Sequence, residues 1–145
     1  MSYSELTRRY FETAPAAGAL EGPDVLHGEA GSRSLGTWVR FDVRVGGAPP
    51  VAAILAARFR AFGCPHVIAA AAWVAEQATG RPADARLPES VEALRERFAV
   101  PVEKTGRLLV VEDAWIAALT GAAPHPGQPS QPGRSGQPEP PERPK

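Results

Sequence analysis

A strictly alternating run from Trp38 to Val45 is the feature that most constrains the fold of this chain. The odd-numbered positions of the run are apolar, and the even-numbered positions after Trp38 are charged. Because successive side chains of a β-strand point to opposite faces, the run predicts a strand with one buried and one solvent-facing side. Residues 46–50 suit a turn, and residues 51–62 form a second extended run. Together the two runs predict an antiparallel hairpin or meander.

Helical periodicity follows the second run. Pro65 suits the first turn of a helix, and apolar residues recur at helical spacing from Val67 to Ala78, before Gly80. Further helices are predicted over residues 3–14, 89–98 and 107–120, the last one stopped by Gly121. Strands that are followed by helices predict an α+β protein, in which helices cover one face of a small antiparallel sheet.

Two segments lack such periodicity. Residues 19–34 show no regular pattern and are expected to form a loop. Of the 22 residues from Pro124 to Lys145, 8 are proline and 3 are glycine. Such a segment cannot bury enough apolar surface to offset the entropy lost on ordering. We therefore expect one domain over residues 1–121 and a disordered Pro/Gly-rich tail over residues 122–145.

The composition argues against several classes of function. The formal net charge is zero, so neither nucleic acid nor an anionic membrane is an expected partner. The charged first residues lack the apolar segment of a secretory signal, and no run approaches the length of a membrane helix. We expect a cytoplasmic protein. Since no nucleophile is spaced with a base and an acid in a recognisable pattern, we do not expect an enzyme.

Cys64 is the single cysteine, and it precedes Pro65 at the predicted start of a helix. A thiolate at a helix N-terminus is stabilised by unpaired N–H groups and by the helix dipole. A free cysteine can equally be a small buried apolar residue. His27 and His66 could ligate a metal, but one cysteine and two scattered histidines do not supply a tetrahedral site.

Several strings, taken in order, resemble the U-type iron–sulfur cluster assembly scaffolds, namely IscU and the N-terminal domain of NifU. Tyr3-Ser4-Glu5 is similar to the opening of that family, residues 58–64 (RFRAFGC) to its A-R-F-K-T-Y-G-C segment, and residues 111–114 (VEDA) to its final helix. The resemblance spans about Tyr3 to Leu119. It implies an IscU/SufE-like α+β fold, with a three-stranded antiparallel sheet and helices packed on one face.

The resemblance also implies an iron–sulfur ligand site, but most of the family's ligand residues are replaced in this chain. The family brings three cysteines and an aspartate to one end of the molecule, where an iron–sulfur cluster binds, and a histidine directly precedes the last of these cysteines. Only one of these ligands has a counterpart here, Cys64. The other family positions are occupied by Leu35, Thr37, Gly106 and Arg107. Because a guanidinium is a permanent cation, Arg107 opposes a metal ion and favours a Cys64 thiolate.

Three functions follow from the resemblance. The chain could still act in cluster assembly with an incomplete ligand set, accept sulfur on Cys64 as SufE-type proteins do, or only bind a partner. A cysteine desulfurase is the partner that the resemblance implies. The family also offers the segment L-P-P-V-K to an Hsp70-type chaperone. Here Pro101 and Lys104 match that segment, but Glu103 replaces an apolar residue and weakens such a contact.

Overall fold

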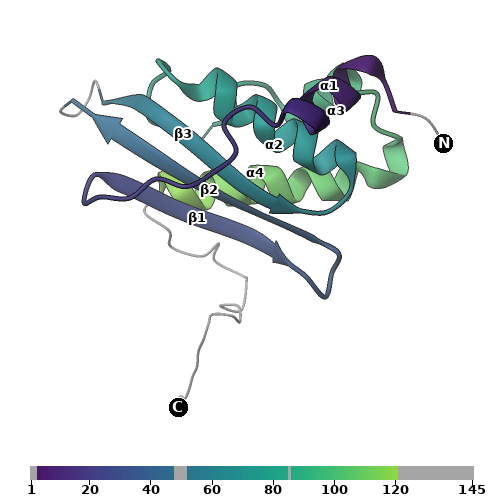
Figure 1. Cartoon of the computed structure of the whole chain (residues 1–145), viewed down its shortest axis with the longest axis horizontal. Coiled ribbons are helices and arrows are strands. Elements are labelled where there is room, and N and C mark those ends of the chain that lie inside the picture. Colours follow the sequence, from purple (N-terminus) through teal and green to yellow (C-terminus); the bar gives the residue numbers. More distant parts are fainter. Residues whose placement is uncertain (1–2, 48–51, 85, 121–145) are drawn as a thin grey trace, which may run out of the picture.

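A computed structural model of the chain describes residues 3–47, 52–84 and 86–120. Its elements are α1 (Glu5–Thr13), β1 (Val25–Ser32), β2 (Thr37–Gly46), β3 (Ala53–Phe62), α2 (Pro65–Ala78), α3 (Val91–Arg97), the 3₁₀ helix η1 (Val102–Lys104) and α4 (Thr105–Leu119). The three strands form one antiparallel sheet in the order β1-β2-β3, with the helices on one face (Figure 1). The predicted α+β fold is confirmed.

The core lies between this sheet and the helices. On β2, the odd-numbered residues Val39, Phe41 and Val43 are fully buried, as the alternation predicts. Phe41 meets Trp115 of α4 edge to face, with ring centroids 5.0 Å apart. Such a pair adds to the stabilisation that burial of its apolar area supplies. The helices therefore cover the sheet face that the sequence marks as apolar.

The described residues include only part of the C-terminal region for which the sequence makes predictions. The helices predicted over residues 65–78, 89–98 and 107–120 correspond to α2, α3 and α4. Gly121 and the predicted tail, residues 122–145, lie outside the described residues. No helix in the described part of the chain has the length and apolar character needed to cross a bilayer.

The expectation of a loop over residues 19–34 is wrong for Val25–Ser32, which form the edge strand β1. Its sequence, VLHGEAGS, does not alternate, and a glycine stands at position 28 because the backbone of α4 approaches the strand closely there. A Cβ atom on Gly28 would lie 2.1 Å from the backbone nitrogen of Ala118. The glycine at position 28 is therefore required by a helix about ninety residues away, which no local pattern reveals.

Asp42 also departs from the predicted pattern. It lies on the charged side of β2, yet only 2% of its surface is exposed. The segment before β1 covers it, and the backbone N–H of Leu20 donates to Oδ2 at 3.0 Å. His27 Nδ1 lies 2.9 Å from Oδ1, and Arg40 Nε donates to the same oxygen at 3.1 Å. Through these hydrogen bonds, Asp42 joins the segment before β1 to the outer face of the sheet.

Substitution of Gly28 tests the contact between β1 and α4. Gly28→Ala should lower the free energy of unfolding by about 1–3 kcal/mol, because backbone atoms of α4 must move to admit the methyl group. Gly106→Ala is the matched control, since its Cβ would meet nothing within 4 Å. This second change should leave stability unchanged or raise it slightly, because alanine favours a helix. Equal denaturant midpoints for both variants would contradict the proposed contact.

Asp42→Asn tests the network on the outer face. Burial opposes ionisation of this carboxyl, but hydrogen bonds from His27, Leu20 and Arg40 outweigh it and lower the pKa of Asp42. Its ionised form therefore stabilises the fold above the usual Asp pKa of about 3.9, and this contribution is lost as the pH falls through the lower folded-state value. Near neutral pH the variant should lose about 1–3 kcal/mol in denaturant unfolding. The difference from wild type should shrink in acid, and a difference that does not depend on pH would refute the assignment.

Candidate functional site

Cys64 occupies the N-cap position of α2, directly after β3. Gly63 precedes it with a backbone φ of 155°, which residues other than glycine rarely adopt. Pro65 follows as the first helical residue, where its missing N–H removes no hydrogen bond. The Gly-Cys-Pro sequence therefore turns the chain from strand to helix and holds the sulfur at the helix N-terminus.

The positions that the resemblance aligns with the family's ligands lie at the same end of the molecule. Leu35 lies in the β1–β2 turn and is 76% exposed, whereas Thr37 begins β2 and is buried. A Cβ on Gly63 would lie 3.5 Å from the carbonyl oxygen of Gly36, so this turn neighbours the Cys64 segment. Gly106 and Arg107 lie in the first turn of α4, which begins at this end of the sheet (Figure 1).

The environment of Cys64 favours its thiolate. The side chain is partly exposed and packs with its other side against the core. Burial alone would raise the pKa of the thiol. The backbone N–H of Val67, the guanidinium of Arg107 and the backbone N–H of His66 outweigh that effect, so the pKa of Cys64 lies below its ordinary value. Cys64 makes no capping hydrogen bond of standard geometry, which is in keeping with the long, weak contacts of sulfur.

His66 lies two residues further on and is 2% exposed. Its ring contacts the ring of Tyr3 edge-on, with centroids 4.7 Å apart. Burial, then the positive charges of Lys104 and Arg107, lower the pKa of His66, so the imidazole is neutral near neutral pH. Its Nδ1 atom is buried and has no hydrogen-bond partner. The sequence identified His66 only as a weak metal-ligand candidate, and nothing in the local pattern predicts this open nitrogen.

The residues at this end do not fit an iron–sulfur cluster or a metal ion. Within residues 3–47, 52–84 and 86–120, no three His, Cys, Asp or Glu side chains are grouped so that they could hold a metal. Leu35 has no lone pair to donate, and Arg107 is a cation with donors only. His27, the other histidine considered from sequence, pairs with Asp42 on the sheet instead.

The segment that resembles the chaperone-binding motif follows α3. Val100 is buried and Pro101 leads into η1, which ends at Lys104. Val102 is 69% exposed, and Glu103 is exposed beside it. Lys104 is also the residue that precedes α4, so it lies near His66 and Arg107. The segment thus borders the Cys64 end of the molecule.

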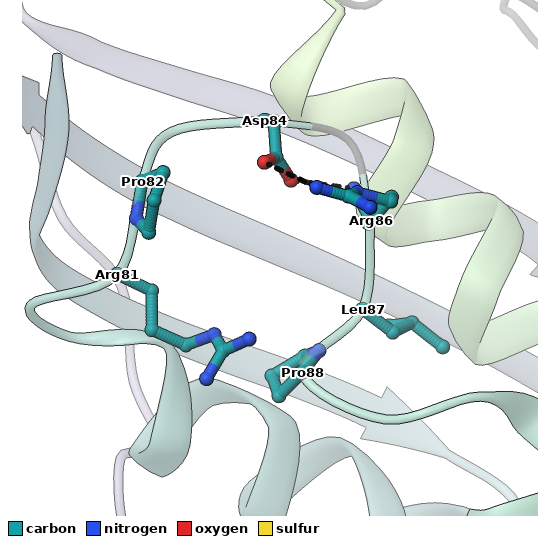
Figure 2. A pocket seen from close by; sticks show the side chains of 6 residues that line it. All are labelled: Arg81, Pro82, Asp84, Arg86, Leu87 and Pro88. Atoms are coloured by element: carbon teal, nitrogen blue, oxygen red, sulfur yellow. Dashed lines mark hydrogen bonds and ion pairs between the residues drawn. The ribbon is translucent and has the colours of Figure 1, made fainter. Parts of the chain in front are cut away.

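A separate pocket of about 290 Å³ lies on the loop between α2 and α3 (Figure 2). Arg81, Pro82, Asp84, Arg86, Leu87 and Pro88 line it. Pro82 pairs with Ala53 at the beginning of β3, whereas Cys64 follows the end of that strand. The pocket is therefore remote from Cys64. Its lining holds no thiol or histidine, and Arg86 turns toward Asp84 at 3.6 Å.

Comparisons with known proteins agree on the kind of domain. The family model of the NifU-like N terminal domain matches residues 2–121. A bifunctional NifU/MnmA protein from Rubrobacter xylanophilus is 45% identical over 65 residues. These residues make up 45% of this chain but only 12% of that much longer protein.

Two solved structures share the fold. One, from Fervidobacterium islandicum, is assigned as an iron–sulfur cluster assembly scaffold protein for the SUF system. It has a TM-score of 0.58 at 16% identity, covering 81% of this chain and 96% of that one. The other is the N-terminal part of a nitrogen-fixing NifU-like protein from Brucella abortus. It has a TM-score of 0.60 at 17% identity, covering 82% and 92%.

The interaction between Arg107 and the sulfur can be tested directly. Arg107→Ala should raise the pKa of Cys64, because it removes a positively charged donor group that favours the thiolate. The ultraviolet absorbance of the thiolate, followed against pH, measures this shift. Arg81→Ala, at the other end of β3, is the matched control and should leave the titration of Cys64 unchanged. If the Arg107 variant titrates like wild type, the guanidinium does not act on the sulfur.

Proposed function

The chain belongs to the family of NifU-like N-terminal domains, the U-type scaffolds of iron–sulfur cluster assembly, and from this membership we propose that it accepts sulfur on Cys64. The observation that carries the proposal is the environment of this thiol. Cys64 is partly exposed at the start of α2, and two backbone N–H groups and Arg107 favour its thiolate. The thiolate is the form of cysteine that attacks sulfur.

The proposed step is the transfer of one sulfane sulfur atom. The Cys64 thiolate attacks the outer sulfur of a cysteine persulfide on a donor protein. A sulfur–sulfur bond forms on Cys64 as the donor's sulfur–sulfur bond breaks, and the bonding pair leaves with the donor thiolate. The products are a persulfide on Cys64 and a free cysteine on the donor, so no further oxidant or reductant is needed. In this role the chain is a stoichiometric acceptor rather than an enzyme.

A cluster held by this chain alone is not part of the proposal. One thiolate leaves most of the coordination sites of iron unfilled, and clusters need several thiolate or imidazole ligands. Arg107 adds a repulsive charge at the place where metal ions would have to lie. The chain therefore contributes sulfur to cluster assembly, and any cluster would form with ligands from another protein.

The partner that we propose is a cysteine desulfurase, which carries the donor persulfide and works in the cytoplasm. Three apolar side chains near Cys64 are exposed and could contribute to such a contact: Leu35, Phe62 and Val102. A chaperone of the Hsp70 type is a weaker candidate. Pro101 and Lys104 fit its motif, but the exposed Glu103 opposes binding in an apolar groove.

Incubation with a cysteine desulfurase and free cysteine tests the function. The intact mass of the chain should rise by one sulfur atom, and a reducing agent should reverse the change. Cys64→Ser should show no increase, although it should fold and bind the desulfurase normally. An unmodified wild-type chain that still binds the desulfurase would indicate a binding-only protein and overturn the proposal.

Anaerobic incubation with iron and sulfide provides a second readout on the same protein. The proposal expects a colourless chain, because the ligand set is too small to hold a cluster. Visible charge-transfer absorbance that disappears in Cys64→Ser would instead show a cluster-holding scaffold. The two readouts therefore separate the three functions that the resemblance leaves open.

A further inference from the structure

Two helices, α2 and α4, begin at the end of the molecule that holds Cys64, and neither is capped by a side chain. The residues that precede them, Cys64 for α2 and Lys104 for α4, make no capping side-chain hydrogen bond, and neither helix has an acidic residue in its first turn. By contrast, α1 and α3 are each capped by a serine, and each carries a glutamate in its first turn. Figure 1 shows α2 and α4 starting at the end of the sheet where β1 turns into β2. No carboxylate in the first turn therefore offsets the positive ends of these two helix dipoles, and at α2 the Cys64 thiolate is the negative group that they favour.

Charged side chains at this end add to the same effect. Lys104 and Arg107 both act on His66, and Arg107 also acts on the sulfur of Cys64. Among the described residues, no carboxylate forms an ion pair with either cation. The nearest acidic residue in sequence, Glu103, is exposed and forms no such pair. Since the Cys64 thiolate balances only one of the two cations, this end keeps a positive charge that attracts a further anion.

His66 provides independent support for a ligand. Its side chain is 2% exposed, and Nδ1 is the one buried side-chain nitrogen or oxygen in the described residues without a hydrogen-bond partner. Folded proteins rarely leave such an atom unpaired unless a ligand or water meets it. The ring lies in the first turn of α2, within electrostatic reach of both cations. As a neutral imidazole, His66 can offer one N–H to an oxygen acceptor.

We propose that His66, Lys104 and Arg107 form an anion-binding subsite beside Cys64, which takes the oxyanion end of a small sulfane-sulfur donor of the thiosulfate class. The proposal rests on the sulfur-acceptor function and adds a second source of sulfur. The Cys64 thiolate attacks the outer sulfur of thiosulfate, a sulfur–sulfur bond forms on Cys64, and the original one breaks. Its bonding pair leaves with sulfite. The cations hold the oxyanion group alike in the bound donor and in the departing sulfite, so they contribute mainly to binding.

The subsite can be tested without the reaction by using Cys64→Ser and sulfite. Sulfite should shift the backbone amide NMR signals of His66 and Arg107 in a saturable manner. Lys104→Ala in the same background should weaken binding at least tenfold, and Lys104→Arg should restore most of it. Since a cation at a helix N-terminus is unfavourable for the helix, loss of Lys104 should not lower the unfolding midpoint. Arg81→Ala, which removes a cation from the remote pocket, should leave binding unchanged.

A reaction arm uses the wild-type chain and thiosulfate. The mass of the chain should rise by one sulfur atom with release of one equivalent of sulfite. Lys104→Ala should raise the half-saturating thiosulfate concentration about tenfold and change the maximal rate much less, because Lys104 is not among the groups that tune the sulfur. With a desulfurase as donor, the same variant should react at nearly the wild-type rate.

The outcomes separate the subsite from the sulfur-acceptor function. If the desulfurase modifies Cys64 but sulfite does not bind to Cys64→Ser, the subsite is wrong and the acceptor function stands. If sulfite binds but neither donor modifies Cys64, the acceptor function is wrong and an anion site remains. Binding that is lost in Arg81→Ala and kept in Lys104→Ala would place the anion in the remote pocket and overturn the proposal.

Discussion

The close packing of α4 against β1 and β2 is the constraint on which the rest of the structure depends. The backbone of Ala118 fits only because residue 28 is glycine, and Trp115 is anchored against Phe41 in the middle of β2. These contacts fix the position of α4 along the sheet and therefore the position of its first turn. Arg107 comes to lie beside Cys64, and Lys104 near His66, because the helix is held by contacts two or more turns further along. The chemistry of the site is therefore coupled to packing at the far end of the helix.

Part of the fold follows from local sequence patterns, and the rest depends on contacts between distant segments. The alternation in β2 and the apolar spacing in α2, α3 and α4 are local, so they predict those elements and most of the core. Local patterns do not predict the edge strand β1, because its Gly28 is required by the contact with α4 and not by the alternation of a strand. Asp42 was predicted to be exposed for a similar reason. Its burial depends on Leu20 and His27, which approach from outside the strand.

The candidate site, like the fold, is predicted in part by local sequence patterns and depends otherwise on contacts between distant segments. The Gly-Cys-Pro sequence predicts a sulfur at a helix N-terminus, and the family resemblance predicts that Arg107 lies at the same end. Neither indicates that His66 is buried with an open nitrogen, because that depends on Tyr3 and on the first turn of α4. Nor does a local pattern show that α4 starts without a cap at the same place as α2. The convergence of two helix starts without a capping side chain is a property of the assembled fold.

This convergence explains how few substitutions are needed to change the kind of ligand that the end of the fold can take. Helix N-termini favour negative charge whatever the side chains around them are. A set of thiolates placed there would bring its own negative charge and could bind cations. Here the resemblance aligns Leu35 and Arg107 with two of the ligand positions, and a single thiolate remains at the start of α2. Two cations, Lys104 and Arg107, then outnumber this thiolate. The proposed sulfur chemistry on Cys64 and the proposed anion subsite both depend on this excess of positive charge.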